Sequence, residues 1–146
     1  IAAGGIADGR QVAAALALGA QGVWLGTVWL AAREHKTSEA LLKQIIAAGS
    51  EDTLVSRAHS GKPARLIRSN WTDEWSSPGA PEPLPMPLHQ VLTGPLIAAV
   101  EEHQVEGLVY GGAGQSVAWC TKETTVDDIM QRLLTETDTA LDVLPR

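Results

Sequence analysis

The sequence predicts an α/β fold in which residues 1 to about 30 form a β–α–β unit and the rest of the chain is mainly helical. Two short apolar runs, residues 1–5 and 22–26, contain glycine at or near their ends and are separated by one helix-length segment. That separation is about the minimum for a crossover between parallel strands. Both runs are continuous rather than alternating, which is typical of a parallel sheet covered on both faces. Two strands alone do not make a stable parallel sheet, so the missing strands come from upstream sequence, from another chain, or from nothing at all.

The helix between the two strands is expected at residues 9–18. Asp8 can cap its start, because the carboxylate accepts hydrogen bonds from N–H groups that the first turn leaves unpaired. Val12 and Leu16 contribute to a narrow apolar face that can pack on a sheet. Gly19 ends the helix.

The segment after the second strand is expected to begin with a helix that Thr27 opens and that covers residues 28–34. Another helix is predicted over residues 38–48, followed by a short strand over residues 52–57. Residues 59–69 are polar and basic, and we predict a loop or short strand with a helical start there.

Proline and glycine divide the second half of the chain. Residues 76–87 are rich in proline and are expected to form a linker or a wrapping segment. Residues 88–103 return to a helical pattern, which Gly94-Pro95 is expected to interrupt. Residues 107–114 are rich in glycine.

A last helix is predicted to begin after Thr125 and to end near Leu141. Asp128 lies three residues beyond Thr125, which is the spacing of a reciprocal cap at a helix start. The sequence contains no internal repeat.

The composition excludes several classes of partner. The 146 residues carry a formal net charge of −6 without a basic stripe, so nucleic acid and a membrane surface are not expected partners. Cys120 is the only cysteine, which excludes an internal disulfide and a cysteine metal cluster, so no metal site is predicted. A single thiol fits a cytoplasmic location. Because the chain starts at Ile1 inside an apolar run, we interpret it as a piece of a longer protein.

Glycines mark the carboxyl ends of both predicted strands. Gly4 and Gly5 follow the first strand, and Gly26 with Thr27 follows the second, while Gly9 lies at the start of the first helix. Glycine allows a ligand to approach the backbone, and N–H groups at a helix start attract a phosphate. Ordinary tight turns would have the same glycines, so spacing alone leaves both interpretations open. The order of glycines does not match a dinucleotide fingerprint, and no Walker lysine is present.

Five stretches of the sequence point to one family when they are taken together. They are Ile1-Ala2-Ala3-Gly4-Gly5-Ile6-Ala7-Asp8-Gly9-Arg10, Ala15-Leu16-Ala17-Leu18-Gly19-Ala20-Gln21-Gly22-Val23, Leu25-Gly26-Thr27, Arg57-Ala58-His59-Ser60-Gly61-Lys62-Pro63-Ala64-Arg65 and, more weakly, Ala113-Gly114-Gln115-Ser116. The set closely resembles the nitronate monooxygenases, formerly called 2-nitropropane dioxygenases. The resemblance covers nearly the whole chain and is strongest in its first third.

The resemblance implies both a fold and an activity. The family folds as a (β/α)8 TIM barrel with an extra, mainly helical, substrate-side domain, binds FMN, and oxidises alkyl nitronates with molecular oxygen. By this likeness, residues 1–35 are the C-terminal part of the barrel, about strands 7 and 8. Residues 36–146 are then the mainly helical substrate-side region.

The resemblance also implies which residues bind FMN. They are Gly4 and Gly5 after strand seven, and Trp24, Leu25, Gly26 and Thr27 at the end of strand eight. Backbone N–H groups and the Thr27 hydroxyl would hold the phosphate. The family's flavin-ring contacts and catalytic histidine lie upstream, so the catalytic residues are not expected in this chain.

Two alternative functions remain open. An FMN-dependent enoyl-acyl carrier protein reductase of the same barrel superfamily would share the glycines after both strands. An inactive partial barrel that pairs with a second copy of itself would explain the missing upstream half, and a homo-oligomer is therefore a possible assembly.

Most other polar and aromatic residues are expected to have structural roles. His35 and His103 lie near predicted helix ends, where a cation is favourable. His59 is expected to be structural or on the surface, and His89 has no partner that the sequence identifies. Lys62, Arg65 and Arg68 are expected to form a solvated face or to pair with local acids. Cys120 is expected to be a buried thiol, and Trp71 and Trp75 are expected to pack on each other. The sequence does not fix the role of Gln115.

Overall fold

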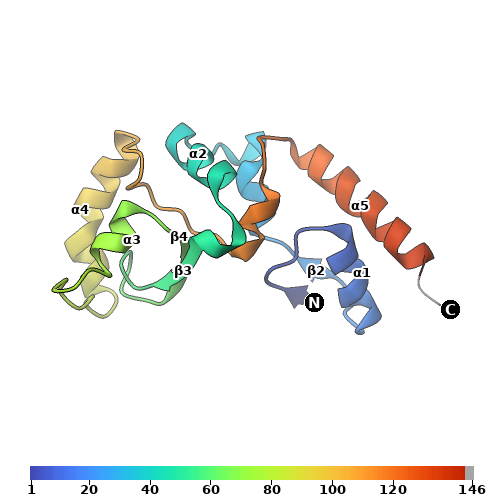
Figure 1. Cartoon of the computed structure of the whole chain (residues 1–146), viewed down its shortest axis with the longest axis horizontal. Helices are drawn as coiled ribbons and strands as arrows, with labels where there is room; N and C mark the ends of the chain where they lie inside the picture. Colours follow the sequence, from blue (N-terminus) through green and yellow to red (C-terminus); the bar gives the residue numbers. More distant parts are fainter. Residues whose placement is uncertain (144–146) are drawn as a thin grey trace.

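The computed structural model describes residues 1–143, and its elements form an elongated arrangement with β1 and β2 toward one end and α4 at the other (Figure 1). The helices are α1 (Gly9–Ala17), α2 (Glu39–Ala47), α3 (Asn70–Glu74), α4 (Leu88–Glu102) and α5 (Val126–Asp142). The strands are β1 (Ala2–Ala3), β2 (Val23–Trp24), β3 (Thr53–Ser56) and β4 (Ala64–Ile67). Short 3-10 turns are η1 (Thr27–Ala31), η2 (Arg33–His35), η3 (Ser50–Asp52) and η4 (Gln115–Trp119).

The predicted β–α–β unit at the start of the chain is confirmed. Strands β1 and β2 pair in parallel, with Ala2 opposite Val23 and Ala3 opposite Trp24. Asp8 caps α1 by accepting a hydrogen bond from the Gln11 N–H at 2.9 Å. The Gln11 side chain accepts in return from the Asp8 N–H, so the cap is reciprocal and fixes where α1 begins.

The last helix returns to the first one. The Thr125 cap with Asp128 is present as predicted, and α5 then packs along α1 (Figure 1). At Gly9, a Cβ atom would overlap the Cβ of Glu136 and the backbone of Thr137. The absence of a side chain at Gly9 therefore sets how closely the two helices approach.

An apolar cluster fills the space between α5 and the segment that follows β2. Its buried members come from the loop before α1, from the region around η1 and from α5: Ala7, Val28, Ala32, Ile129 and Leu133. This cluster joins parts of the chain that are about a hundred residues apart.

The predicted helix over residues 28–34 is wrong. Two 3-10 turns, η1 and η2, stand in its place, because Ala32 between them is extended and pairs with Thr124. The Thr124 N–H donates to the Ala31 carbonyl at 3.0 Å, and the Arg33 N–H donates to the Thr124 carbonyl at 2.9 Å. A continuous α-helix would need these same backbone groups for its own hydrogen bonds.

The predicted helix over residues 38–48 is confirmed as α2, which Ser38 caps. The predicted strand over residues 52–57 is confirmed as β3, and it forms an antiparallel hairpin with β4. For residues 59–69 the strand alternative was right, but the expected helical start was wrong. A turn stands there instead, and at Gly61 it has a φ of 81°, which glycine adopts without strain.

The proline-rich segment has no helix or strand through residue 85, as predicted, but the predicted interruption of the next helix is wrong. Helix α4 runs through Pro95 without a break. A proline disfavours helical backbone at the preceding residue largely because it meets that residue's Cβ, and Gly94 has none. Pro95 still costs α4 one backbone hydrogen bond, because proline has no N–H.

Within residues 1–143, no helix combines the length and the apolar character needed to cross a bilayer. The predicted division of the chain at residue 35 stays a prediction.

Gly9→Ala should lower the free energy of unfolding by about 1–3 kcal/mol, the usual cost of overpacking, because the new Cβ must push α5 away from α1. Chemical denaturation followed by circular dichroism measures the change. Gly22→Ala is the matched control, since a Cβ at Gly22 meets nothing within 4 Å and is expected to change stability by less than about 0.5 kcal/mol. Equal stability of the two variants would contradict the role of Gly9.

Candidate functional site

Two loops leave the same edge of the β1–β2 sheet. Because the strands are parallel and in register, the loop that begins with Gly4 and Gly5 and the loop that begins at Leu25 start side by side. Gly4 and Gly5 have φ angles of 91° and 74°, in the left-handed region that side chains disfavour. A Cβ at either residue would meet no atom within 4 Å. Backbone conformation, rather than crowding by the chain, is therefore what requires glycine here.

The backbone donors at this edge are unused within residues 1–143. Among residues 1–143, the N–H groups of Gly4, Gly5, Gly26 and Thr27 donate to no other group. N–H groups that converge at the starts of adjacent turns provide a favourable environment for an anion. The donor set fits a phosphate group, which accepts several hydrogen bonds and carries negative charge.

Thr27 adds a side-chain donor to the same edge. Its hydroxyl oxygen accepts a hydrogen bond from the Gly114 N–H at 2.9 Å. Its backbone carbonyl accepts from the Cys120 thiol at 3.5 Å. Since the oxygen already accepts one bond, the hydroxyl keeps its proton for donation outward.

The two other predicted site residues, Trp24 and Leu25, lie just before Gly26 and Thr27, and their role at the site stays a prediction. Trp24 lies on β2 and is 69 % exposed. Leu25 packs its side chain against the cluster between α5 and η1, and its carbonyl accepts from the Trp29 indole N–H at 2.8 Å. Of the six predicted residues, the structure therefore brings Gly4, Gly5, Gly26 and Thr27 together.

Two residues of the same glycine-rich stretch have structural roles instead. Gly9 packs against α5, and its N–H donates to the Glu136 carboxylate at 2.8 Å. Asp8 is buried and caps α1. Burial acts to raise the pKa of the Asp8 carboxyl, but the Gln11 N–H and the Arg10 guanidinium lower it, so the pKa lies below its ordinary value. Asp8 is therefore an ionised capping group rather than a proton donor.

Helix α5 also holds the loop that carries Gly4 and Gly5. The Arg132 guanidinium donates to the Ala7 carbonyl at 3.2 Å and forms an ion pair with Glu136 at 3.4 Å. Together with the bond from Gly9 to Glu136, this fixes the downstream end of the loop.

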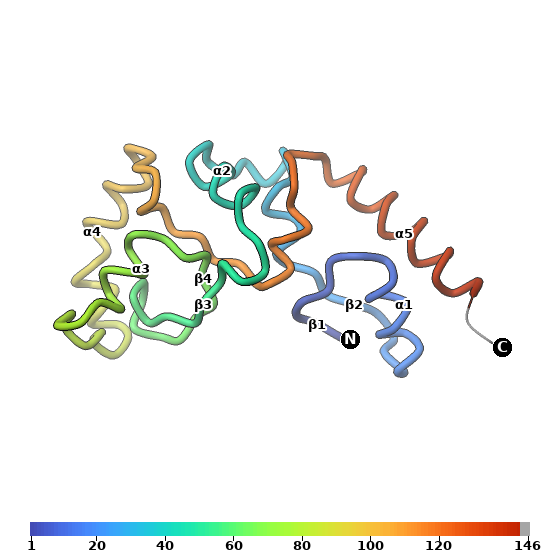
Figure 2. The backbone as a smooth tube through the Cα atoms, viewed as in Figure 1, coloured from blue at the N-terminus to red at the C-terminus, as the bar shows by residue number. Residues whose placement is uncertain are grey.

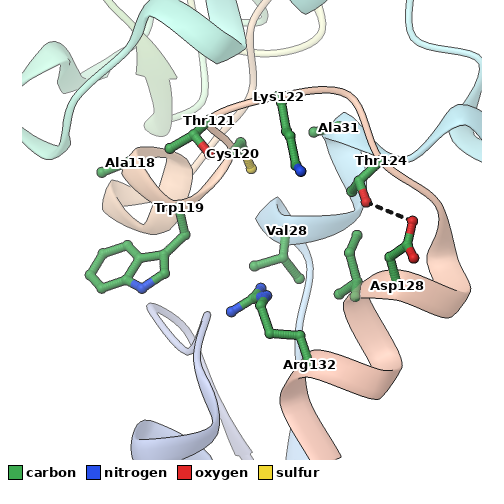
Figure 3. Close-up of a pocket in the computed structure, with 11 residues that line it drawn as sticks. Val28, Ala31, Ala118, Trp119, Cys120, Thr121, Lys122, Thr124, Asp128 and Arg132 are labelled. Atoms are coloured by element: carbon green, nitrogen blue, oxygen red, sulfur yellow. Dashed lines mark hydrogen bonds between the residues drawn. The ribbon is translucent and has the colours of Figure 1, made fainter. Parts of the chain in front are cut away.

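An open cleft of about 620 Å³ begins at Val28, one residue beyond Thr27 (Figure 3). Val28 and Ala31 contribute apolar surface, while Lys122 extends into the space from the loop after η4 and Arg132 from α5 on the opposite side. Trp119 closes one end (Figure 3). The cleft thus combines apolar surface with two cationic side chains.

Cys120 lies in the wall of this cleft but is a poor nucleophile. The residue is 5 % exposed, and burial raises the pKa of its thiol, although the nearby Arg132 acts in the opposite direction. The thiolate is the reactive form, so a raised pKa makes the group inert at neutral pH. The expectation of a buried thiol is confirmed.

The histidines lie away from the glycine loops. His89 is fully buried, and its Nδ1 accepts from the Leu84 N–H at 3.2 Å, so Nε2 carries the proton that it donates to the Ala58 carbonyl at 3.0 Å. His59 stacks on Tyr110 with ring centroids 3.8 Å apart, and burial lowers its pKa. These contacts give both residues structural roles.

His35 and His103 stand at the end of η2 and just after α4, near helix ends as predicted. No group of three or more metal-ligating side chains forms among residues 1–143.

The remaining candidates are placed as follows. Arg68 pairs with Asp73 at 2.9 Å, which confirms pairing with a local acid for this residue. Arg65 is exposed and donates to Thr53. Trp71 and Trp75 pack with ring centroids 6.0 Å apart, as expected. Gln115 is exposed at the start of η4.

Sequence reasoning missed the contribution of Gly114, whose contact with Thr27 joins positions 87 residues apart. The only signal for it was the weak Ala113-Gly114-Gln115-Ser116 match.

Comparison with known proteins identifies one family that covers most of the chain. A family model described as nitronate monooxygenase matches residues 1–136. A Staphylococcus aureus (strain Newman) protein named as a probable nitronate monooxygenase is 38 % identical over 116 residues, which cover 80 % of this chain and 32 % of that protein. A Mycobacterium tuberculosis protein, Rv1533, whose assigned name is that of a monooxygenase, is 56 % identical over 92 residues, 63 % of this chain and 24 % of that protein.

Solved structures agree with the sequence relatives. A nitroalkane oxidase from Streptomyces ansochromogenes superposes with a TM-score of 0.82 at 29 % identity, over 97 % of this chain and 40 % of that one. FabK from Thermotoga maritima superposes with a TM-score of 0.71 at 27 % identity, over 96 % of this chain and 44 % of that one. The chain therefore spans less than half the length of the proteins it resembles.

The Cys120 thiol should react with a thiol reagent such as a disulfide dye on the order of a hundredfold more slowly in the folded chain than in guanidinium chloride. The reason is that Cys120 is buried and its pKa is raised. Because it is the only cysteine of the chain, absorbance of the released dye reports this site alone. Equal rates in both conditions would mean that the thiol is accessible and that η4 does not pack as described.

Proposed function

The chain belongs to the nitronate monooxygenase family, and we propose that it is the C-terminal part of an FMN-dependent enzyme that oxidises alkyl nitronates with molecular oxygen. The family match over residues 1–136 supports the reaction class. One observation supports the position of the phosphate site. Two glycine loops leave the same edge of the β1–β2 sheet, and their backbone N–H groups are unused within the described residues.

We propose that β1 and β2 are the seventh and eighth strands of a (β/α)8 barrel. Helix α1 then follows strand seven, and α5 follows strand eight, with residues 27–124 inserted between strand and helix. The packing of α5 on α1 supports this order, because successive helices of such a barrel lie side by side around the sheet. This arrangement assigns α5 to the barrel, whereas the division predicted from the sequence placed all of residues 36–146 in the substrate-side region.

The proposed phosphate site consists of Gly4, Gly5, Gly26 and Thr27. Phosphate sites of (β/α)8 enzymes often lie in the loops after the last two strands, which is where these residues stand under the proposed numbering. The left-handed backbone of Gly4 and Gly5 turns that loop without a side chain between the backbone and the ligand. The Thr27 hydroxyl supplies a further donor. Together they provide neutral donors to a dianionic group.

When bound, FMN would supply the redox chemistry, accepting two electrons from the substrate and passing them to oxygen. The part of this chain is to bind and orient. The glycine loops would hold the phosphate, and the cleft begins at Val28, the residue after Thr27. Since no histidine lies at the glycine loops, we propose that the proton-abstracting residue comes from the rest of the enzyme.

Spectroscopy and two assays separate this proposal from its alternatives. The visible spectrum of the full-length enzyme, recorded after adding FMN and desalting, should retain a flavin band. Oxygen consumption with an alkyl nitronate should then exceed any oxidation of NAD(P)H. NAD(P)H oxidation with an enoyl thioester and no nitronate turnover would favour the reductase, and no retained flavin would favour an inactive barrel. Cytoplasmic location and a homo-oligomeric state stay predictions.

Gly5→Val should abolish retention of FMN, because a branched side chain would stand where the phosphate approaches and would strain a residue whose φ is 74°. Fluorescence titration of the apo-enzyme with FMN measures the affinity. We expect a loss of about a hundredfold or more, consistent with removal of several charge-assisted hydrogen bonds.

Gly19→Val is the matched control for backbone strain. Gly19 has a φ of 96° in the same β–α–β unit, and a Cβ there also meets nothing within 4 Å. The control should lose stability and keep its affinity for FMN. Tight FMN binding by Gly5→Val, or equal weakening in both variants, would refute the proposed anchor.

A further inference from the structure

The Thr27 hydroxyl is contacted by a segment far along the chain. The Gly114 N–H donates to the Thr27 Oγ1 at 2.9 Å across 87 residues of sequence. Figure 2 shows how the backbone, after passing α4 at one end of the molecule, returns to the centre beside the segment that follows β2. We propose that Gly114 is a positioning residue that directs the Thr27 hydroxyl proton toward the flavin phosphate. This inference rests on the proposed function.

The direction follows from the bonding capacity of a hydroxyl. The group has one proton to donate and two lone pairs that accept. The Gly114 N–H occupies an acceptor position, so the proton cannot point at Gly114 and is available on another side. Among residues 1–143 the Thr27 hydroxyl donates to no group. A phosphate oxygen at the glycine edge would receive that proton in a charge-assisted hydrogen bond.

The turn η4 holds Thr27 at two points. Gly114 caps the start of η4 and contacts the Thr27 side chain, while Cys120 caps its end and donates to the Thr27 carbonyl at 3.5 Å. The turn itself is anchored in the core, because Val117 is fully buried and packs with Ile45. The donor therefore comes from a rigid support, which is what accurate placement of a binding group requires.

The identity of residue 114 is consistent with this role. A Cβ on Gly114 would lie 3.3 Å from the Thr27 Oγ1, closer than most real Cβ contacts. Its backbone φ is −82°, near the value that proline adopts. Gly114→Pro therefore suits the backbone and removes the N–H donor, and its ring also displaces the hydroxyl, because Cδ takes the place of the amide hydrogen. Gly114→Ala keeps the donor and displaces the hydroxyl by a few tenths of an ångström.

The experiment compares FMN with riboflavin, which lacks the phosphate. Dissociation constants are measured by fluorescence quenching in the full-length apo-enzyme for wild type, Thr27→Val, Thr27→Ser, Gly114→Pro and the double variant Thr27→Val/Gly114→Pro. Melting temperatures of the apo-forms show which variants fold. A merely structural role would change the affinities for FMN and riboflavin alike. Loss of a contact to the phosphate would weaken FMN binding alone.

We expect Thr27→Val to weaken FMN binding by about 10- to 100-fold, as for loss of a hydrogen bond to a charged group, and to leave riboflavin binding nearly unchanged. Thr27→Ser should stay close to wild type. Gly114→Pro should weaken FMN binding selectively by about 3- to 10-fold, because the donor is lost and the hydroxyl is displaced, and should add nothing in the Thr27→Val background.

Each other outcome overturns a specific statement. Unchanged FMN affinity in Thr27→Val would refute the Thr27 hydroxyl as a phosphate donor, and with it this inference, whereas Gly5→Val tests the anchor itself. A weakened Thr27→Val beside a wild-type-like Gly114→Pro, or equal losses for FMN and riboflavin, would refute the positioning role alone. If Gly114→Pro does not fold, Gly114→Ala takes its place, and an unchanged ratio of the two affinities would count against the inference.

Discussion

The close approach of α1 and α5 at Gly9 is the contact on which the rest of the site depends. The ladder between β1 and β2 contains only two residue pairs, which is too little to define where the following loops lead. Helix α5 fixes the course of the first loop, because Arg132 binds the Ala7 carbonyl and Glu136 binds the Gly9 N–H. The glycine loop is therefore fixed by a helix more than a hundred residues away in sequence. A side chain at Gly9 would push this support away.

The features that could be predicted from the sequence are those that short-range chemistry determines. Asp8 and Thr125 each have the right partner three residues on, so both helix starts follow from local hydrogen bonding. The parallel strands follow from the length of the crossover and from continuous apolar runs. Family resemblance added the positions of the glycines, and the structure brings four of the six predicted residues to one edge.

The features that could not be predicted depend on contacts between distant segments. Ala32 is extended only because Thr124 pairs with it, and nothing near Ala32 indicates that partner. His89 and Gly61 are both buried beside Leu84, in the proline-rich segment. The sequence predicted only an irregular structure for that segment, so it gave no sign of these contacts. The link from Gly114 to Thr27 has the same origin, since its two ends are adjacent only after the intervening region has folded. Gly9 illustrates a further difficulty, because a glycine required for helix packing stands within a motif of glycines suited to a ligand.

The second face of the β1–β2 sheet connects the fold to its function. Ala3 and Trp24 lie opposite each other and are both exposed, whereas Ala2 and Val23 are partly buried. A parallel sheet is stable when both faces are covered, and within the described residues the helices supply one cover. In the proposed barrel the side chains of the other strands supply the second. The loops with Gly4, Gly5 and Thr27 would then lie on the rim of a closed sheet, where added strands hold β1 and β2 in register. The same closure that buries Trp24 would also fix the spacing between the two groups of phosphate donors.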